Sequence, residues 1–279
     1  MSTMGFSKIG YCNGAVKRYR SWNPFGMGCS GGCDGCWARA LSKRLAKAGC
    51  PDCLAFRPHM HRERLGQPSR VKKPSFVLCN FTNDWMDPTR GDNDLLALLN
   101  AAVDADRHTY IMLTKQAGHL AAFAEKNMRH GRYDDNWFIG LTITSQADAD
   151  AKLDTFLQTP GNLWISYEPA AGPVDWRDWF TRYEETGFDP ECDYSHLRGL
   201  ICGHDNRRGA PGTGGLWPIR QTVEQCDAAG VNVYVKQLWR CFTDGTRNHW
   251  KLLRASHPDE YALYPDWAKR RDLPWAKDT

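Results

Sequence analysis

Residues 28–38 read Gly-Cys-Ser-Gly-Gly-Cys-Asp-Gly-Cys-Trp-Ala and place Cys29, Cys33 and Cys36 within eight residues. Glycine fills three of the five positions between these cysteines, and glycine reaches backbone angles that let a short loop aim three thiolates at one object. Thiolates bind soft metals and hold iron–sulfur clusters. Three thiolates leave one iron of a 4Fe-4S cube free to bind a substrate or cofactor. Zinc or free thiols are the alternatives, and zinc is disfavoured because a zinc site usually has four protein ligands.

The segments on either side of this loop indicate its place in the fold. Arg18 to Trp22 is a plausible strand, and it is followed by Asn23-Pro24. From Trp37 onward, apolar residues recur at helical spacing, with basic residues on the opposite face. The three cysteines therefore lie on a loop between a strand and a helix.

The strand-and-helix pattern then repeats along the chain. Further strands are expected at 75–81, 109–114, 137–142, 163–167, 197–203 and 231–236, with helices at 94–104, 117–128, 147–157 and 219–229. The strands are short apolar runs, typical of a parallel sheet that is buried on both faces. Strands alternating with helices predict an α/β fold with parallel strands and outer helices, closed as a complete or partial (β/α) barrel. An open doubly wound sheet is the alternative.

The chain length of 279 residues is compatible with one large domain. We expect a barrel domain over 1–242, with insertions at 50–74 and 169–195, and an extension over 243–279 that packs on the barrel. No apolar stretch approaches the roughly 20 residues of a membrane helix, and the first ten residues lack the apolar run of a signal peptide. We therefore expect a cytoplasmic protein with no membrane partner. Its net charge of +4 is compatible with a nucleic-acid partner.

The expected strands share polar residues at their carboxyl ends, where barrels gather functional groups. These ends include Asn83 and Asp84, Thr114 and Lys115, Thr142, Ser166 and Glu168, His204, and Lys236. Polar ends on the same face as the three cysteines favour a single shared site. A polar strand end can instead cap the following helix, and that alternative applies to Asn83 and Ser145.

The Cys29-x3-Cys33-x2-Cys36 spacing after a first strand resembles the signature of the radical S-adenosylmethionine (SAM) superfamily. Over residues 20–240 the chain also resembles a phage-encoded three-Cys-motif family. The matching segments are Trp22-Asn23-Pro24, Gly28-Cys29, Cys33-x2-Cys36-Trp37-Ala38, Leu113-Thr114-Lys115, Ser166-x-Glu168-Pro169 with Gly172-Pro173, and Ala229-Gly230-Val231 with Val235-Lys236-Gln237-Leu238-Trp239. The chain departs at Gly203-His204-Asp205-Asn206, where relatives often read Gly-Gly-Glu-Ser.

The resemblance implies a cofactor set and residue roles. Cys29, Cys33 and Cys36 would hold a 4Fe-4S cluster whose open iron binds SAM, and a reductase or flavodoxin-like protein would donate the electron. Cofactor contacts are assigned to the second to fifth strand ends: Asn83, Asp84, Thr114, Thr142 and Ser166. Groups that meet the substrate are expected farther round the barrel: Lys115, Glu168, Lys236 and His204.

The same resemblance implies a reaction on a nucleobase. The chain is similar to phage isomerases that rearrange glycinyl-thymidine from a nitrogen link to a carbon link, a DNA hypermodification that evades host restriction in the host cytoplasm. In duplex DNA the base must be extruded, and Trp85 or Trp239 could stack on it. Radical repair or another modification of a nucleobase is the alternative, and a non-catalytic metal-binding nucleic-acid module is the alternative of another class.

A second cysteine pair, Cys50 and Cys53, is followed by His59 and His61. This spacing is compatible with a structural zinc site. A chance pair of thiols and a second cluster completed by Cys12 or Cys79 are the alternatives. The surrounding stretch from Arg57 to Lys73 has six basic residues against one acidic residue, Glu63, which suits either a phosphate backbone or a solvated loop.

Overall fold

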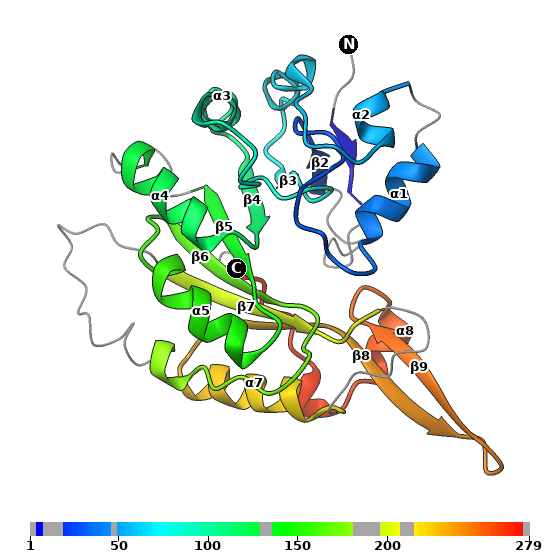
Figure 1. Ribbon diagram of the computed structural model, residues 1–279. Helices are drawn as coiled ribbons and strands as arrows, with labels where there is room; N and C mark the ends of the chain where they lie inside the picture. The colour runs from blue at the N-terminus through cyan, green and yellow to red at the C-terminus, as the bar shows by residue number, and fades with distance from the viewer. Residues whose placement is uncertain are drawn as a thin grey trace.

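The computed structural model describes residues 4–7, 19–45, 49–128, 136–180, 196–206 and 215–275. These residues form one sheet of nine strands, and the strands lie side by side in the order in which they occur in the sequence (Figure 1). The strands are β1 (Gly5–Phe6), β2 (Tyr19–Trp22), β3 (Phe76–Cys79), β4 (Thr109–Thr114), β5 (Trp137–Thr142), β6 (Asn162–Tyr167), β7 (His196–Gly203), β8 (Val233–Thr243) and β9 (Asn248–Arg254).

The seven strands from β2 to β8 are parallel, while β1 and β9 pair antiparallel at the two edges. This arrangement confirms the predicted α/β architecture. Strand order follows the sequence without a reversal, which excludes the doubly wound alternative. Among the described strands, β2 and β8 do not pair with each other, so the parallel sheet is an open arc, a partial barrel.

The longer helices follow strands, as expected of βα units, and lie around the outer side of the curved sheet (Figure 1). They are α1 (Trp37–Leu45), α3 (Asp92–Val103), α4 (Ala117–Asn127), α5 (Gln146–Phe156) and α7 (Trp217–Ala228). The shorter elements are α2 (Pro51–Leu54), α8 (Pro258–Ala262) and the 3-10 turns η2 (Arg62–Arg64), η3 (Pro68–Arg70) and η4 (Asp266–Ala268). None of the described helices has the length and apolarity that crossing a bilayer requires.

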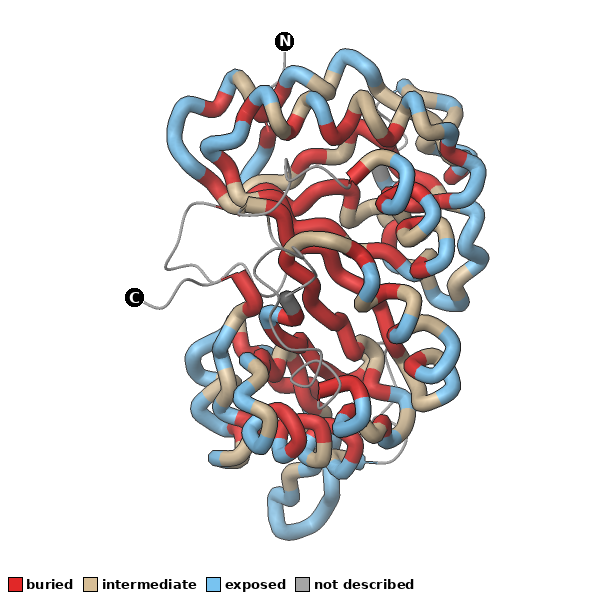
Figure 2. The backbone as a smooth tube through the Cα atoms, turned by 90° about the vertical axis from the view of Figure 1, so that its left-hand side faces the viewer, coloured by how far each residue is buried: buried red, intermediate tan, exposed pale blue. Residues whose placement is uncertain are grey.

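The core lies along the parallel strands, where Figure 2 shows the buried residues gathered. β5 and β6 are buried at every position, which explains why their sequences are continuous apolar runs. The packing is close enough to require glycine at position 140, because a Cβ there would lie 2.3 Å from the Trp164 ring. Gly140 and Trp164 are register partners on these two strands.

The segment after Thr243 belongs partly to the sheet. β9 pairs with the outer half of β8, and Arg271 forms a bridge with Tyr234 farther back on the same strand. Trp275 is buried, and its indole N–H donates to the Tyr19 hydroxyl on β2 over 3.0 Å. The C-terminal segment thus contacts both the first and the last parallel strands. The predicted insertion at 169–195 is described only to residue 180.

Candidate active site

The three clustered cysteines lie where the sequence predicts, on the loop between β2 and α1 at the carboxyl end of the first parallel strand. All three side chains are half-buried. A Cβ at Gly31 would lie 3.7 Å from the Cys29 sulfur and 3.8 Å from the Cys33 sulfur, so these two sulfurs flank the same glycine. The loop therefore places the Cys29 and Cys33 thiols on either side of one short turn.

The connection that follows β3 holds this loop and the segment before it in place. The Phe25 N–H donates to the Asn80 side-chain oxygen over 3.1 Å, and the Gly26 carbonyl accepts from Thr82 Oγ1 and Asn83 Nδ2. Farther along, the Ser30 N–H donates to an Asp87 carboxylate oxygen. Each of these contacts spans more than fifty residues of sequence, so the loop is fixed by the fold rather than by its own residues.

Lys115, at the end of β4, reaches the cysteine loop. Its ammonium nitrogen lies 3.1 Å from the Cys33 sulfur. Asp84 accepts from the Lys115 backbone N–H over 2.9 Å and from Thr114 Oγ1 over 2.6 Å, so it orients the turn that carries the lysine. Burial raises the pKa of the Asp84 carboxyl, and these two hydrogen bonds oppose that shift. The structure thus brings together predicted residues from three strand ends.

Among the other residues predicted to bind the cofactor, some have a hydrogen-bonding group without a partner in the described part of the chain and others do not. Asn83 Oδ1 is buried and has no hydrogen-bond partner among the described residues, so this acceptor is available to a ligand. Thr114 Oγ1, by contrast, donates to Asp84 and accepts from the Gln116 N–H. Thr142 and Ser166 are register partners at the ends of β5 and β6, and both are buried.

Glu168 and Lys236 form an ion pair across the end of β7. The Lys236 nitrogen lies 2.9 Å and 3.1 Å from the two Glu168 carboxylate oxygens. The Lys236 side chain is 21% exposed and the Glu168 side chain is 14% exposed. Gly203 lies between them on β7, and a Cβ there would lie 3.1 Å from Glu168 Oε1. Glycine therefore leaves room for the ion pair. Two of the predicted substrate-contacting groups thus meet each other.

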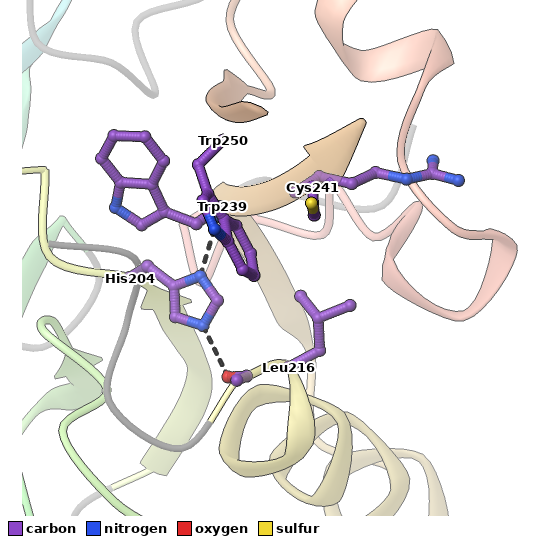
Figure 3. A pocket seen from close by; sticks show the side chains of 7 residues that line it. His204, Leu216, Trp239, Cys241 and Trp250 are labelled. Carbon is purple, nitrogen blue, oxygen red and sulfur yellow. Dashed lines mark hydrogen bonds between the residues drawn. The ribbon is translucent and has the colours of Figure 1, made fainter. Parts of the chain in front are cut away.

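His204, directly after β7, uses one ring nitrogen to contact β8 and the other to contact Gly215, just before α7 (Figure 3). Its Nδ1 accepts from the Trp239 N–H over 2.9 Å, and its Nε2 donates to the Gly215 carbonyl over 2.9 Å. Burial lowers the pKa of this imidazole, which keeps the ring neutral. These contacts occupy the ring within the protein, which suits a structural role for His204 better than contact with a substrate.

Of the two tryptophans expected to stack on an extruded base, Trp85 is unsuitable. Its side chain is fully buried, so the expectation is wrong for this residue. Trp239 is half-buried, and its indole N–H donates to the Asp205 carbonyl over 2.6 Å. Trp85 lies in the polar stretch Thr82-Asn83-Asp84-Trp85-Met86-Asp87, so the sequence gave no signal that its side chain is in the core.

The outer half of β8 and β9 forms a hairpin that the sequence analysis missed, and it projects from the body (Figure 1). At its base is a pocket of about 290 Å³, drawn in Figure 3. The pocket is lined by His204, Gly215, Leu216, Trp239, Arg240, Cys241 and Trp250. Trp250 is 53% exposed. The alternation of aromatic and basic residues over 239–251 is the sequence signal that could have identified this hairpin.

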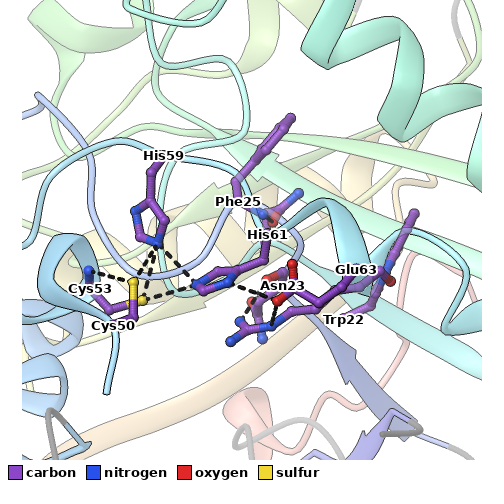
Figure 4. A network of polar contacts seen from close by, with 10 residues as sticks. Trp22, Asn23, Phe25, Cys50, Cys53, His59, His61 and Glu63 are labelled. Carbon is purple, nitrogen blue, oxygen red and sulfur yellow. Dashed lines mark hydrogen bonds and ion pairs between the residues drawn. The ribbon is translucent and has the colours of Figure 1, made fainter. Parts of the chain in front are cut away.

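The predicted zinc ligands Cys50, Cys53, His59 and His61 are also brought together (Figure 4). Their ligand atoms all lie within 4.8 Å of one another, and among the described residues no other group of three or more His, Cys, Asp or Glu side chains is so placed. Cys79, an alternative ligand, is buried on β3 outside this set. Cys12 lies outside the described residues. The cysteines of the 29–36 loop are thus not gathered around a single-ion position.

The fold and the site define a class: α/β proteins with an open parallel βα barrel and a three-cysteine loop at the carboxyl end of the first parallel strand. Within it, residues 7–259 match the family described as "Protein of unknown function (DUF5131)", and the chain belongs to that family. No curated protein matches the chain.

Three solved structures of spore photoproduct lyase are similar to the chain. A double mutant with bound AdoMet and dinucleoside spore photoproduct has a TM-score of 0.45 and 14% identity, covering 96% of this chain and 75% of that one. A cysteine-to-serine mutant has the same TM-score and identity, with 97% and 76% covered. A cysteine-to-alanine mutant with the dinucleoside has a TM-score of 0.42 and 13% identity, with 96% and 75% covered.

Proposed function

We propose that the protein is a radical SAM enzyme in which Cys29, Cys33 and Cys36 hold a 4Fe-4S cluster. The observation that carries the proposal is the position of three half-buried thiols on one loop at the carboxyl end of the first parallel strand. Their sulfurs are not close enough together to bind a single metal ion. This wider spacing is expected of ligands that hold a cluster of four irons and four sulfides. When bound, the cluster and SAM supply a 5′-deoxyadenosyl radical that abstracts a substrate hydrogen.

The residues around the loop suit the binding of SAM. The free acceptor Asn83 Oδ1 would receive the methionyl ammonium, and Thr142 and Ser166 would receive the carboxylate or ribose. Asp84 and Thr114 bond to each other and so hold the turn on which Lys115 lies. The Lys115 ammonium lies 3.1 Å from the Cys33 sulfur, so its positive charge would lie beside the proposed cluster.

For the substrate, we propose a modified thymidine in phage DNA, isomerised from a nitrogen-linked to a carbon-linked glycine in the host cytoplasm. The Glu168–Lys236 pair supports this choice, because its two charges match the amine and carboxylate of an amino-acid substituent. Repair or another modification of a nucleobase uses the same site and remains the second candidate.

The β8–β9 hairpin is the better candidate surface for DNA. It carries Arg240, Arg247 and Lys251 together with the exposed Trp250, a combination that suits phosphates and an unstacked base. In the basic connection over 50–74, Arg57 and Arg62 pair with Asp52 and Asp94, much as Lys251 of the hairpin pairs with Glu260, but this connection contains no tryptophan that could stack on a base. We therefore assign the nucleic-acid contact to the hairpin.

Anaerobic reconstitution with iron and sulfide tests the proposal. We expect a brown protein with about four irons per chain, the number in one cube, that releases 5′-deoxyadenosine from SAM with dithionite or reduced flavodoxin. A colourless protein that binds only zinc would overturn both enzyme candidates and favour a non-catalytic metal-binding module. Mass spectrometry of nucleosides from glycinyl-thymidine DNA then separates isomerisation, which leaves the mass unchanged, from repair or group transfer.

Binding of single-stranded DNA tests the hairpin. Trp250→Ala should weaken binding roughly fivefold or more, since a stacked base contributes about 1–3 kcal/mol. Phe6→Ala, which removes another exposed aromatic ring on β1, is the matched control and should bind normally. Equal affinity of the two variants would remove the hairpin from the proposed interface.

A further inference from the structure

We propose that Cys50, Cys53, His59 and His61 form a structural zinc site that positions the approach to the three-cysteine loop. The site is closed, because the protein supplies four ligands and leaves no position for a substrate. Its existence does not rest on the proposed enzyme activity.

The sulfur–nitrogen separations fit a tetrahedral zinc ion, and the two ring nitrogens lie slightly closer together than such an ion would place them. The His59 Nε2 lies 3.5 Å from the Cys50 sulfur and 3.3 Å from the Cys53 sulfur. The His61 Nε2 lies 3.4 Å from the Cys53 sulfur and 3.0 Å from the His59 Nε2. Zinc bonds of about 2.0–2.1 Å to nitrogen and 2.3 Å to sulfur place tetrahedral ligand atoms about 3.3–3.8 Å apart. The four atoms therefore surround a space of the size of one ion.

The other ring nitrogens are held as they are in zinc sites. His59 Nδ1 lies 2.8 Å from the Arg57 carbonyl oxygen, which can only accept, so this nitrogen carries the proton. His61 Nδ1 lies 3.0 Å from a Glu63 carboxylate oxygen. Both Nε2 atoms then present lone pairs toward each other and toward the sulfurs (Figure 4). A bound cation explains why these electron-rich atoms converge.

The local sequence directs both thiols to the same side. Cys50 has extended backbone angles and precedes Pro51, which begins the single turn of α2. The Cys53 N–H donates to the Cys50 sulfur over 3.4 Å, so the two sulfurs lie across one turn. A second iron–sulfur cluster is disfavoured because two of the four converging ligands are imidazoles and the buried Cys79 lies elsewhere.

The segment that carries His59 and His61 packs against the chain that leads into the three-cysteine loop, through side chains and backbone groups. A Cβ at Gly26 would lie 2.5 Å from His59 Nε2, and a Cβ at Gly28 would lie 2.5 Å from the Arg57 carbonyl oxygen. The His61 N–H donates to the Pro24 carbonyl over 2.6 Å. Both glycines have positive φ, +65° and +143°, so backbone shape and close approach each require glycine there. The zinc ligands therefore set the path of residues 24–28, directly before Cys29.

Zinc analysis of the iron-free wild-type protein tests the site without any assay of SAM chemistry. We expect one zinc per chain and an X-ray absorption spectrum with two sulfur and two nitrogen neighbours. A protein that binds no zinc, or one whose zinc has a four-sulfur or all-oxygen shell, overturns the proposal. Because this measurement needs no variant, it remains decisive even if a ligand variant fails to fold.

Variants then assign the ligands. Cys53→Ser should lose the zinc, whereas Cys241→Ser, which alters an exposed thiol on the hairpin, should retain it. Cys33→Ser should also retain zinc, which separates this site from the proposed cluster. Zinc retained at full occupancy in Cys53→Ser, or lost in Cys33→Ser, contradicts the assignment.

Hydrogen exchange tests the positioning role. Chelation of zinc from the wild-type protein should increase amide exchange over residues 22–37, while exchange in β5 and β6 remains unchanged. Unchanged exchange over 22–37 overturns the positioning role.

Discussion

The two cysteine-containing sites of this protein lie close in sequence but differ in the number of ligand atoms and in how closely those atoms converge. The loop with Cys29, Cys33 and Cys36 has three thiols, is rich in glycine and is held by contacts from other strand ends. The Cys50 to His61 site has four ligand atoms within 4.8 Å, and its ring nitrogens are bonded on their far sides. The first is open and the second is closed.

The difference indicates how each site is used. A closed ligand set stabilises the local fold, whereas an incomplete set keeps a position for a reactant. The same distinction applies to the strand ends. His204 is satisfied on both nitrogens within the protein, whereas Asn83 Oδ1 has no partner among the described residues.

The strongest test of the contrast between the open and the closed site is Cys33→Ala, for which we expect the largest effect. We expect this change to reduce iron binding and SAM cleavage to background, because an open site with three ligands has no spare ligand. The measurement is iron content and 5′-deoxyadenosine release after anaerobic reconstitution. Cys241→Ala is the control and should behave as wild type. SAM cleavage that persists in Cys33→Ala would show that the ligands are assigned wrongly.

Removal of zinc tests the closed site. Binding of structural zinc contributes directly to folding, so chelation should lower the free energy of unfolding by several kcal/mol. Thermal unfolding of the iron-free protein, with and without a chelator, measures this change. Cys53→Ser should already unfold at the lower temperature and should not respond to the chelator. An unchanged wild-type midpoint would argue against a stabilising metal.

The Glu168–Lys236 ion pair tests whether two charged side chains that bond to each other only stabilise the fold or also bind a substrate. Glu168→Gln leaves a mostly buried ammonium without its partner, and we expect a loss of about 1–3 kcal/mol, measured by urea unfolding. The double variant Glu168→Gln with Lys236→Met should recover most of that stability. If both groups bind substrate, the double variant still forms 5′-deoxyadenosine but no product. A double variant with normal product formation would exclude the pair from the site.

The smallest expected effect is the pH dependence contributed by His204. Burial holds the pKa of this imidazole below its usual value near 6.5. As the pH falls, His204 therefore takes up a proton in the unfolded chain before it does so in the folded protein. The free energy of unfolding decreases between about pH 6.5 and the lower pKa of the folded state, by at most about 1.4 kcal/mol per pH unit. Urea unfolding from pH 7.5 to 5.5 measures the slope. His204→Gln should flatten it, whereas His257→Asn, a change at an exposed ring, should not.

The sequence predicted the parallel strands well because their residues are apolar on both faces. β4 and β5 have the expected bounds, and α1 begins at Trp37 as expected. The predicted end of a strand was wrong where the strand continues from the buried core into solvent. β8 was expected to end at Lys236 but continues to Thr243, because its outer half is half-exposed and mixes charged with aromatic residues.

Residue spacing also predicted that Cys50, Cys53, His59 and His61 come together, since they lie within a few residues of one another. It could not predict which strand-end groups bond to each other, because those contacts depend on register and on small residues between strands. Gly203 is an example: only the structure shows that its missing side chain leaves room for the Glu168–Lys236 pair. Likewise, no local pattern distinguished the buried Trp85 from the exposed Trp250.

The contact between Trp275 and Tyr19 has a consequence for synthesis of the chain. β2 emerges from the ribosome early, but the indole that covers its aromatic side chain is made 256 residues later. Trp275 also packs edge-on against Trp164 and Phe138. These strands therefore keep exposed aromatic surface during translation until the segment around Trp275 has left the ribosome. Co-translational chaperones should accordingly engage the nascent chain over β2 to β6, and truncation before Trp275 should prolong that engagement.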